Sequence, residues 1–128
     1  NYVGQPWRTQ EIVDEVLHTL YFNNPDGLSG NEDCGQMSAW YILNAMGFYQ
    51  VCPGKPVYSI GRPLFNEATV HLKDGKSFKV IAHNNSRDNK YVRSIVLNGN
   101  KLETPFFTHQ DIVDGGTLEL TMGSEPLK

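Results

Sequence analysis

The sequence predicts an α+β chain in which helices come first and strands follow. Three observations predict it: apolar residues recur with a helical period before Pro53-Gly54, they follow a period of two after it, and two hairpin signals, Asp74-Gly75 and Asn98-Gly99, lie among the later apolar runs. We therefore divide the 128 residues into a helical segment, 1–53, and a strand segment, 54–128. Closely spaced short strands with such turns favour an antiparallel β-sandwich.

The first helix is expected to begin near Thr9, because threonine is a favourable N-cap residue. One face of this helix is apolar and carries Ile12, Val13, Val16, Leu17 and Leu20. The breaker segment 23–27, Asn-Asn-Pro-Asp-Gly, follows the helix.

The second helix is expected from about Cys34 to Phe48, and it is apolar on nearly all sides. Its large side chains are Met37, Trp40, Tyr41, Leu43 and Met46. A helix of this kind is normally buried all round, which predicts that a larger body surrounds it. If that body is missing, the exposed apolar side chains favour self-association.

From Tyr58 onward we expect a series of short strands. Residues 68–72 and 77–82 form a hairpin that is joined through Asp74-Gly75. A further strand, 91–97, runs into Asn98-Gly99. Near the end of the chain Leu118, Leu120 and Met122 alternate with polar residues, as in a half-buried strand.

Composition excludes several functional classes. The net charge is −3 and the sequence pI is about 5.7, so the chain has no basic surface for nucleic acid. No apolar run has the length of a membrane span. The chain starts at Asn1 without an initiator methionine or a signal peptide, so we expect it to be a piece of a longer or processed protein.

The two cysteines, Cys34 and Cys52, flank the second predicted helix. At a rise of about 1.5 Å per residue the helix ends lie roughly 18 Å apart. A disulfide needs Cα atoms within about 7 Å. Two free thiols are therefore expected, acting as small buried apolar side chains.

The acidic turn that precedes the second helix, residues 30–35 (Gly-Asn-Glu-Asp-Cys-Gly), is the strongest functional signal. Asp33 with Gln36 three residues later fits a capping box, in which the carboxylate accepts a backbone N–H. The same carboxylate could instead be a general base, held on a glycine-bounded turn and aimed into a cleft to deprotonate a water. The two roles are compatible, because a helix N-terminus keeps a carboxylate ionised.

Other polar and aromatic residues give weaker signals. Gln5 and Trp7 form an amide and aromatic pair that suits a sugar ring, although Trp7 could simply pack over the start of the first helix. Residues 26–33 do not form a calcium loop of the EF-hand type, because Leu28 and Met37 occupy positions that need oxygen ligands. The four histidines have no metal-ligand spacing. The residues alone thus indicate a carboxylate site without specifying a reaction.

Four blocks of sequence resemble glycoside hydrolase family 92, the calcium-dependent exo-α-mannosidases. The blocks are residues 2–10 (YVGQPWRTQ), residues 30–41 (GNEDCGQMSAWY) continued by 44–54 (NAMGFYQVCPG), residues 61–65 (GRPLF) and residues 91–99 (YVRSIVLNG). They occur in the order that the family has. The resemblance implies that 1–53 are the final helices of a catalytic (α/α)6 barrel and that 54–128 are β-sandwich strands, so that the chain is a C-terminal fragment.

The resemblance also implies a reaction and roles for individual residues. The family hydrolyses terminal α-mannosides of glycans with inversion, and α-1,2 linkages are the expected substrate. Asp33 matches the general base, Asn31 takes the place of an assisting acid, and Gln5, Trp7 and Glu32 are assigned to substrate binding. The general acid and most calcium ligands lie outside these residues, so no metal ligand is assigned here.

Three further expectations come from the resemblance. The chain alone should be inactive, because one member of the acid–base pair is missing. The rest of the same polypeptide is its partner, and the location is periplasmic or secreted. The alternative to an enzyme is a non-catalytic β-sandwich that braces the barrel or binds carbohydrate.

Overall fold

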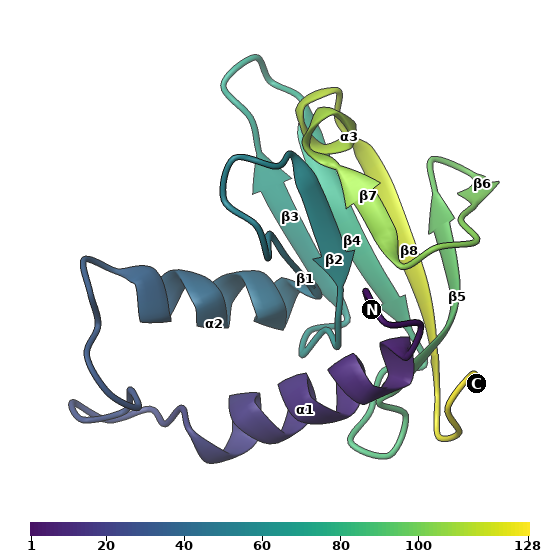
Figure 1. Cartoon of the computed structure of the whole chain (residues 1–128). Coiled ribbons are helices and arrows are strands. Elements are labelled where there is room, and N and C mark those ends of the chain that lie inside the picture. The colour runs from purple at the N-terminus through teal and green to yellow at the C-terminus, as the bar shows by residue number, and fades with distance from the viewer.

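The computed structural model describes all of residues 1–128 and contains two helices, a set of short strands and one further short helix (Figure 1). The helices are α1 (Pro6–Thr19), α2 (Gln36–Met46) and α3 (His109–Val113). The strands are β1 (Phe48–Tyr49), β2 (Val57–Ile60), β3 (Glu67–His71), β4 (Ser77–His83), β5 (Tyr91–Leu97), β6 (Asn100–Lys101), β7 (Phe106–Thr108) and β8 (Gly116–Gly123). Helices are followed by strands, but the first strand, β1, lies before the predicted change at Pro53 and pairs with β2, and the short helix α3 lies among the later strands.

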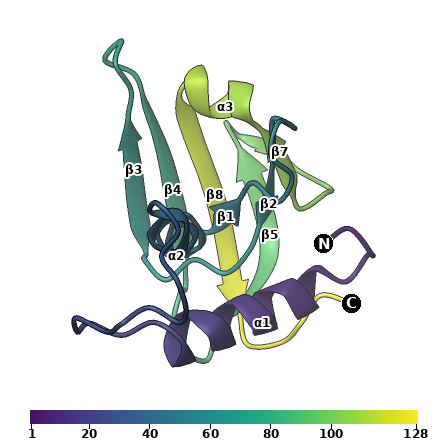
Figure 2. The same ribbon diagram turned by 60° about the vertical axis from the view of Figure 1, so that its left-hand side comes forward.

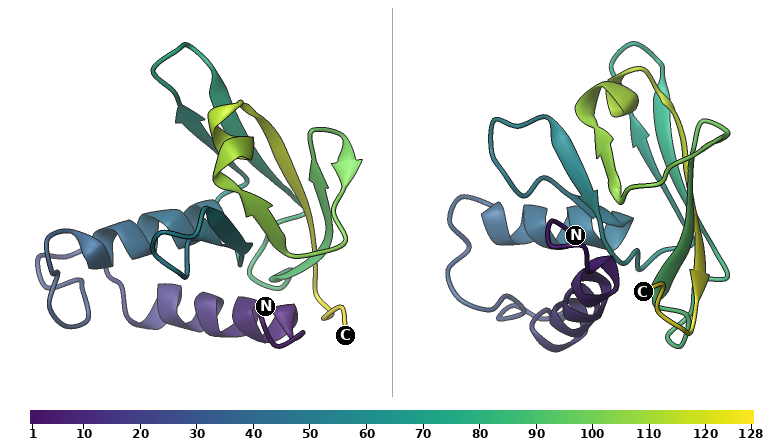
Figure 3. Two further views of the ribbon diagram at one scale, coloured as in Figure 1. Left: turned by 45° about the horizontal axis from the view of Figure 1, so that its top comes forward. Right: turned by 45° about the vertical axis from the view of Figure 1, so that its right-hand side comes forward.

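The strands form two sheets that lie as separate layers (Figure 3). The smaller sheet has the order β1-β2-β7, and the larger has the order β3-β4-β8-β5-β6. The two predicted hairpins are confirmed: β3 pairs with β4 around Gly75, and β5 pairs with β6 around Asn98-Gly99. Both Asn98 and Gly99 have positive φ, as a tight hairpin turn requires.

The larger sheet is mixed, so the prediction of a purely antiparallel sandwich is wrong. Strand β8 pairs in parallel with β4, with Val80 opposite Leu118, and antiparallel with β5. A parallel pair needs a long crossover connection. Here the chain leaves β4, forms β5, β6, β7 and α3, and only then returns to insert β8 between β4 and β5.

The core lies between the two sheets and is built largely from aromatic and branched side chains. Phe48 meets Phe107 edge to face at 5.3 Å between ring centroids, and Phe107 stacks on Phe78 at 5.7 Å. Leu118 and Leu120 are fully buried against them. The alternation predicted for the last strand is therefore confirmed.

Both long helices begin or end at points other than those predicted. α1 starts at Pro6 rather than near Thr9. Proline is favourable at the first helical position, because the N–H that it lacks would have no hydrogen-bond partner within the helix there. The Thr9 hydroxyl accepts a hydrogen bond from the amino terminus at 2.8 Å instead. α2 ends at Met46 because Gly47, with φ of +104°, caps it in the left-handed conformation.

Within this chain α2 is covered on one side only. Asn44 and Ala45 are its buried residues, whereas Ile42 is 56% exposed. Figure 1 shows the helix extending away from the sheets, above α1.

Cys34 and Cys52 are both free, as predicted, but both are exposed, so the prediction that they are buried is wrong. No helix has the length and apolarity that a bilayer crossing requires.

Helix α1 crosses the lower ends of the strands (Figure 2) and is tied to them by polar side chains. Gln10 accepts a hydrogen bond from the Val92 backbone N–H at 3.2 Å. The Arg62 guanidinium, in the segment after β2, lies 2.8 Å from Asp14 on α1. These contacts link the first helix to the sandwich.

Candidate active-site turn

The acidic turn has an unusual backbone. Gly30, Asp33, Cys34 and Gly35 all have positive φ, at 84°, 49°, 59° and 90°. The left-handed conformation costs roughly 1–2 kcal/mol at each non-glycine residue. Such strain gathers at functional sites and persists where the surrounding structure enforces it. The two strained residues here, Asp33 and Cys34, are the centre of the predicted site.

The residue that caps α2 is Glu32, so the prediction of a helix cap at Asp33 is wrong. The Glu32 carboxylate accepts the Ser38 backbone N–H at 3.1 Å and the Ser38 hydroxyl at 3.0 Å. Gly35 occupies the N-cap position itself and has no side chain to offer. The left-handed run from Asp33 to Gly35 places the longer glutamate within reach of the helix, and Asp33 makes no such bond.

Asp33 and Asn31 are both exposed, and neither side chain makes a hydrogen bond or an ion pair within the chain. The turn thus presents one carboxylate and one amide outward, while Glu32 between them holds the turn to the helix. The sequence pattern had favoured Asp33, rather than Glu32, as the residue that caps the helix. The signal that could have pointed to Glu32 is the hydroxyl at Ser38, a partner that a glutamate six residues away can reach.

The structure does not bring Gln5 and Trp7 to the acidic turn. Both lie at the start of α1, and the turn lies beyond its other end (Figure 1). A helix of 14 residues is about 21 Å long, so the two groups are too far apart for one sugar ring. Gln5 is exposed and makes no capping bond, whereas Trp7 lines a cavity against β5.

Comparison with known proteins decides the family. A family model described as the glycosyl hydrolase family 92 catalytic domain matches residues 1–124. The chain belongs to glycosyl hydrolase family 92. A curated relative, an uncharacterized secreted glycosidase of Arthroderma benhamiae, is 29% identical over 98% of this chain and 16% of its own length.

Solved structures of family 92 enzymes carry the same fold. The α-mannosidase BT3965 from Bacteroides thetaiotaomicron matches with a TM-score of 0.88 and 42% identity over 94% of this chain. The inverting mannosidase BT2199 from the same organism matches with a TM-score of 0.89 and 48% identity over 97%. This chain spans 16% of the first and 17% of the second, or about one sixth of each.

The tyrosine that follows α1, Tyr21, packs against two aromatic side chains of α2. Tyr21 stacks on Trp40 with ring centroids 5.6 Å apart, and it contacts Tyr41 at 4.9 Å. Burial, and then the charge of Glu32, raise the pKa of the Tyr21 hydroxyl above its ordinary value of 10.0. Sequence reasoning missed this contact, because Tyr21 follows the first helix and gives no periodic signal.

Family 92 enzymes are generally calcium-dependent, and the chain offers few ligands for that ion. No three His, Cys, Asp or Glu side chains lie close enough together to hold a metal. Asp33 and Asn31 carry the hard oxygen atoms that Ca²⁺ prefers, but the ion takes six to eight of them.

Proposed function

We propose that this chain is the C-terminal part of the catalytic region of an exo-α-mannosidase. Residues 1–53 are then the last helices of an (α/α)6 barrel, and 54–128 are its β-sandwich. Membership of family 92 and the α-mannosidases that are 42% and 48% identical support this proposal. One of them is named an inverting mannosidase, and another structure of BT3965 is a complex with mannoimidazole.

In this proposal Asp33 is the general base that deprotonates the attacking water. The observation that carries it is the free, exposed carboxylate on a strained backbone, beside a second carboxylate that already caps the helix. Asn31 assists by hydrogen bonding to the water or the sugar. Glu32 contributes to substrate binding through the turn that it fixes, and Gln5 remains a candidate for a more distant part of the glycan.

An inverting glycosidase needs a general acid across the sugar from its base, with the two carboxyl groups about 6.5–9.5 Å apart. We assign that acid to the rest of the polypeptide, because this chain spans about one sixth of its relatives. The isolated 128 residues are therefore expected to be inactive. The proposed substrates are terminal α-1,2-mannosides, and the proposed cofactor is calcium. The proposed location is periplasmic or secreted, because a curated relative is named a secreted glycosidase.

The test is Asp33→Asn in the full-length enzyme. Loss of a general base is expected to lower kcat by about 10²–10⁴-fold, with an unchanged thermal midpoint. Asp26→Asn is the matched control, because Asp26 is an exposed aspartate on the same connection between helices. Full turnover by the Asp33 variant would overturn the assignment of the base.

A second function, bracing of the barrel by the sandwich, is supported by the buried Asp14–Arg62 contact between the first helix and the sandwich. This reading expects Asp33→Asn to leave kcat unchanged. It also expects a change at Arg62 to lower the thermal midpoint of the whole enzyme. The kcat of Asp33→Asn is the measurement that separates the two functions.

A further inference from the structure

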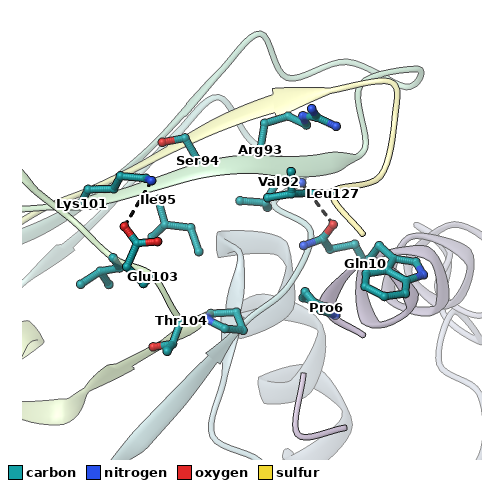
Figure 4. A pocket seen from close by; sticks show the side chains of 13 residues that line it. Pro6, Gln10, Val92, Arg93, Ser94, Ile95, Lys101, Glu103, Thr104 and Leu127 are labelled. Atoms are coloured by element: carbon teal, nitrogen blue, oxygen red, sulfur yellow. Dashed lines mark hydrogen bonds and ion pairs between the residues drawn. The ribbon is translucent and has the colours of Figure 1, made fainter. Parts of the chain in front are cut away.

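A cavity of about 150 Å³ lies between the first turns of α1 and strand β5, at the end of α1 that is remote from the acidic turn (Figure 4). Trp7 and Gln10 line it from the helix, and Ile95 from the strand. Lys101 and Glu103 lie at the β6 side. Nothing in the proposed reaction at Asp33 uses this space.

Gln10 gives the cavity a buried polar group with unused hydrogen-bonding capacity. The residue is 3% exposed, and its side-chain oxygen accepts the Val92 N–H at 3.2 Å. Because a backbone N–H can only donate, the amide oxygen faces Val92 and the amide nitrogen faces elsewhere. That nitrogen donates to no group in the chain, and Figure 4 shows the Gln10 side chain reaching beneath β5 into the cavity.

Of the three charged side chains around the cavity, Lys101 and Glu103 neutralise each other, and Arg93 keeps its positive charge. The Lys101 ammonium lies 3.2 Å from the Glu103 carboxylate, so this pair carries no net charge. Arg93 is engaged elsewhere, because its guanidinium donates to the Glu125 carbonyl at 2.8 Å and to that of Pro126 at 3.2 Å. The one cation without a carboxylate partner is thus held by carbonyl groups, and the remaining acceptor is an anionic carboxylate, so the cavity suits a neutral polar ligand rather than an anion.

Size and lining narrow the ligand class further. A cavity of about 150 Å³ can hold a six-membered ring such as benzene. The indole of Trp7 and the rings of Pro6 and Pro105 supply apolar surface, which matches the C–H faces of a sugar. A pyranose ring with its hydroxyl groups directed at Gln10 and at the Lys101–Glu103 pair combines both requirements.

We propose that this cavity binds one neutral pyranose residue of a glycan, at a site distinct from the acidic turn. The Gln10 amide nitrogen donates to one hydroxyl, and the Glu103 carboxylate accepts from another. The ligand class rests on the proposed glycosidase function, whereas the cavity and its unused donor do not. Such a site would hold a glycan at a second point while its terminal residue is cleaved elsewhere.

The test is methyl-detected NMR of the full-length protein in the Asp33→Asn background, with methyl α-D-mannopyranoside as the probe. The Ile95 methyl signal reports on the cavity, because Ile95 lines it. We expect this signal to shift in a saturable way. Gln10→Glu keeps the oxygen that accepts from Val92 but loses the donor, and it should weaken binding about tenfold or more. Gln110→Glu, at an exposed position of α3, is the matched control and should bind as the parent does.

A second variant covers the case in which Gln10→Glu does not fold. Glu103→Gln changes a side chain that is 79% exposed, so the fold is retained, and it should also weaken the probe. An Ile95 shift with sodium sulfate but not with the mannoside would overturn the proposal. So would the absence of a saturable shift, or parental affinity in the Gln10 and Glu103 variants that fold. Loss of turnover in Asp33→Asn is measured separately, so each proposal can fail alone.

Discussion

Glu32 and Ser38 are joined by two hydrogen bonds, one from the Ser38 backbone N–H at 3.1 Å and one from its hydroxyl at 3.0 Å. The pair ties the acidic turn to the first turn of α2. It therefore sets the point from which Asp33 projects, although Asp33 itself takes no part in the bonding.

Replacing Glu32 by alanine should destabilise the chain by about 1 kcal/mol, the usual cost of losing a helix cap. The measurement is chemical denaturation of the 128-residue chain. Ser38→Ala is the partial control, because it removes the hydroxyl bond and keeps the backbone one. Equal stability of the Glu32 variant and the parent would show that the cap contributes nothing.

The contact between Asp14 and Arg62 is buried, with 13% and 3% of the two side chains exposed. Asp14→Asn leaves the Arg62 charge without its carboxylate, and such a loss costs about 3–5 kcal/mol. Glu67→Gln is the matched control, because the Glu67–Lys79 pair has the same 2.8 Å separation but lies at the surface. A surface pair contributes only about 0–1 kcal/mol. Similar free energies of unfolding for the two variants would contradict the difference in burial.

Gly116, at the start of β8, has φ of +136°, and a Cβ there would collide with the Asn98 side chain. The Asn98 side-chain oxygen accepts the Thr117 N–H at 2.8 Å, so the collision would also break this bond. Gly75 also has a positive φ, of +82°, but open space around it. Gly116→Ala should therefore cost about 1–3 kcal/mol more than Gly75→Ala in denaturation experiments. Equal costs would mean that the Asn98 side chain moves away freely.

Glu11 links α1 to β5, because it accepts the Tyr91 hydroxyl at 2.8 Å and pairs with Arg8 at 2.7 Å. The hydrogen bond from Arg8, and then that from Tyr91, hold the pKa of the Glu11 carboxyl below its ordinary 4.5. A depressed pKa stabilises the fold above the unfolded-state pKa, and this contribution is lost as the pH falls through the folded-state value.

The thermal midpoint of Tyr91→Phe should therefore lie below that of the parent at neutral pH. The gap should narrow as the pH falls below 4.5, the ordinary pKa of Glu11. Thermal melts of the two proteins across this range are the measurement. A gap that stays constant down to about pH 3, below the usual glutamate range, would show that the Tyr91 hydroxyl acts independently of the Glu11 charge.

Local sequence was sufficient for the helices, the hairpins and the family. The Asp-Gly and Asn-Gly turns specify hairpins through residues that tolerate positive φ, and the alternation in Gly116–Gly123 specifies a half-buried strand. Both features depend on neighbours in the chain. The motif around Asp33 likewise identified the family without any knowledge of the fold.

Only the tertiary structure decided the parallel pairing of β8 with β4, the choice of Glu32 over Asp33 as the cap, and the cavity beside Gln10. The physical reason is common to all three. The strand pairing and the cavity depend on where distant backbone segments meet. The cap depends on a left-handed turn at non-glycine residues, a conformation that local preferences disfavour. The sequence was sufficient to locate the acidic turn, but it did not show which of the two carboxylates, Glu32 or Asp33, caps α2.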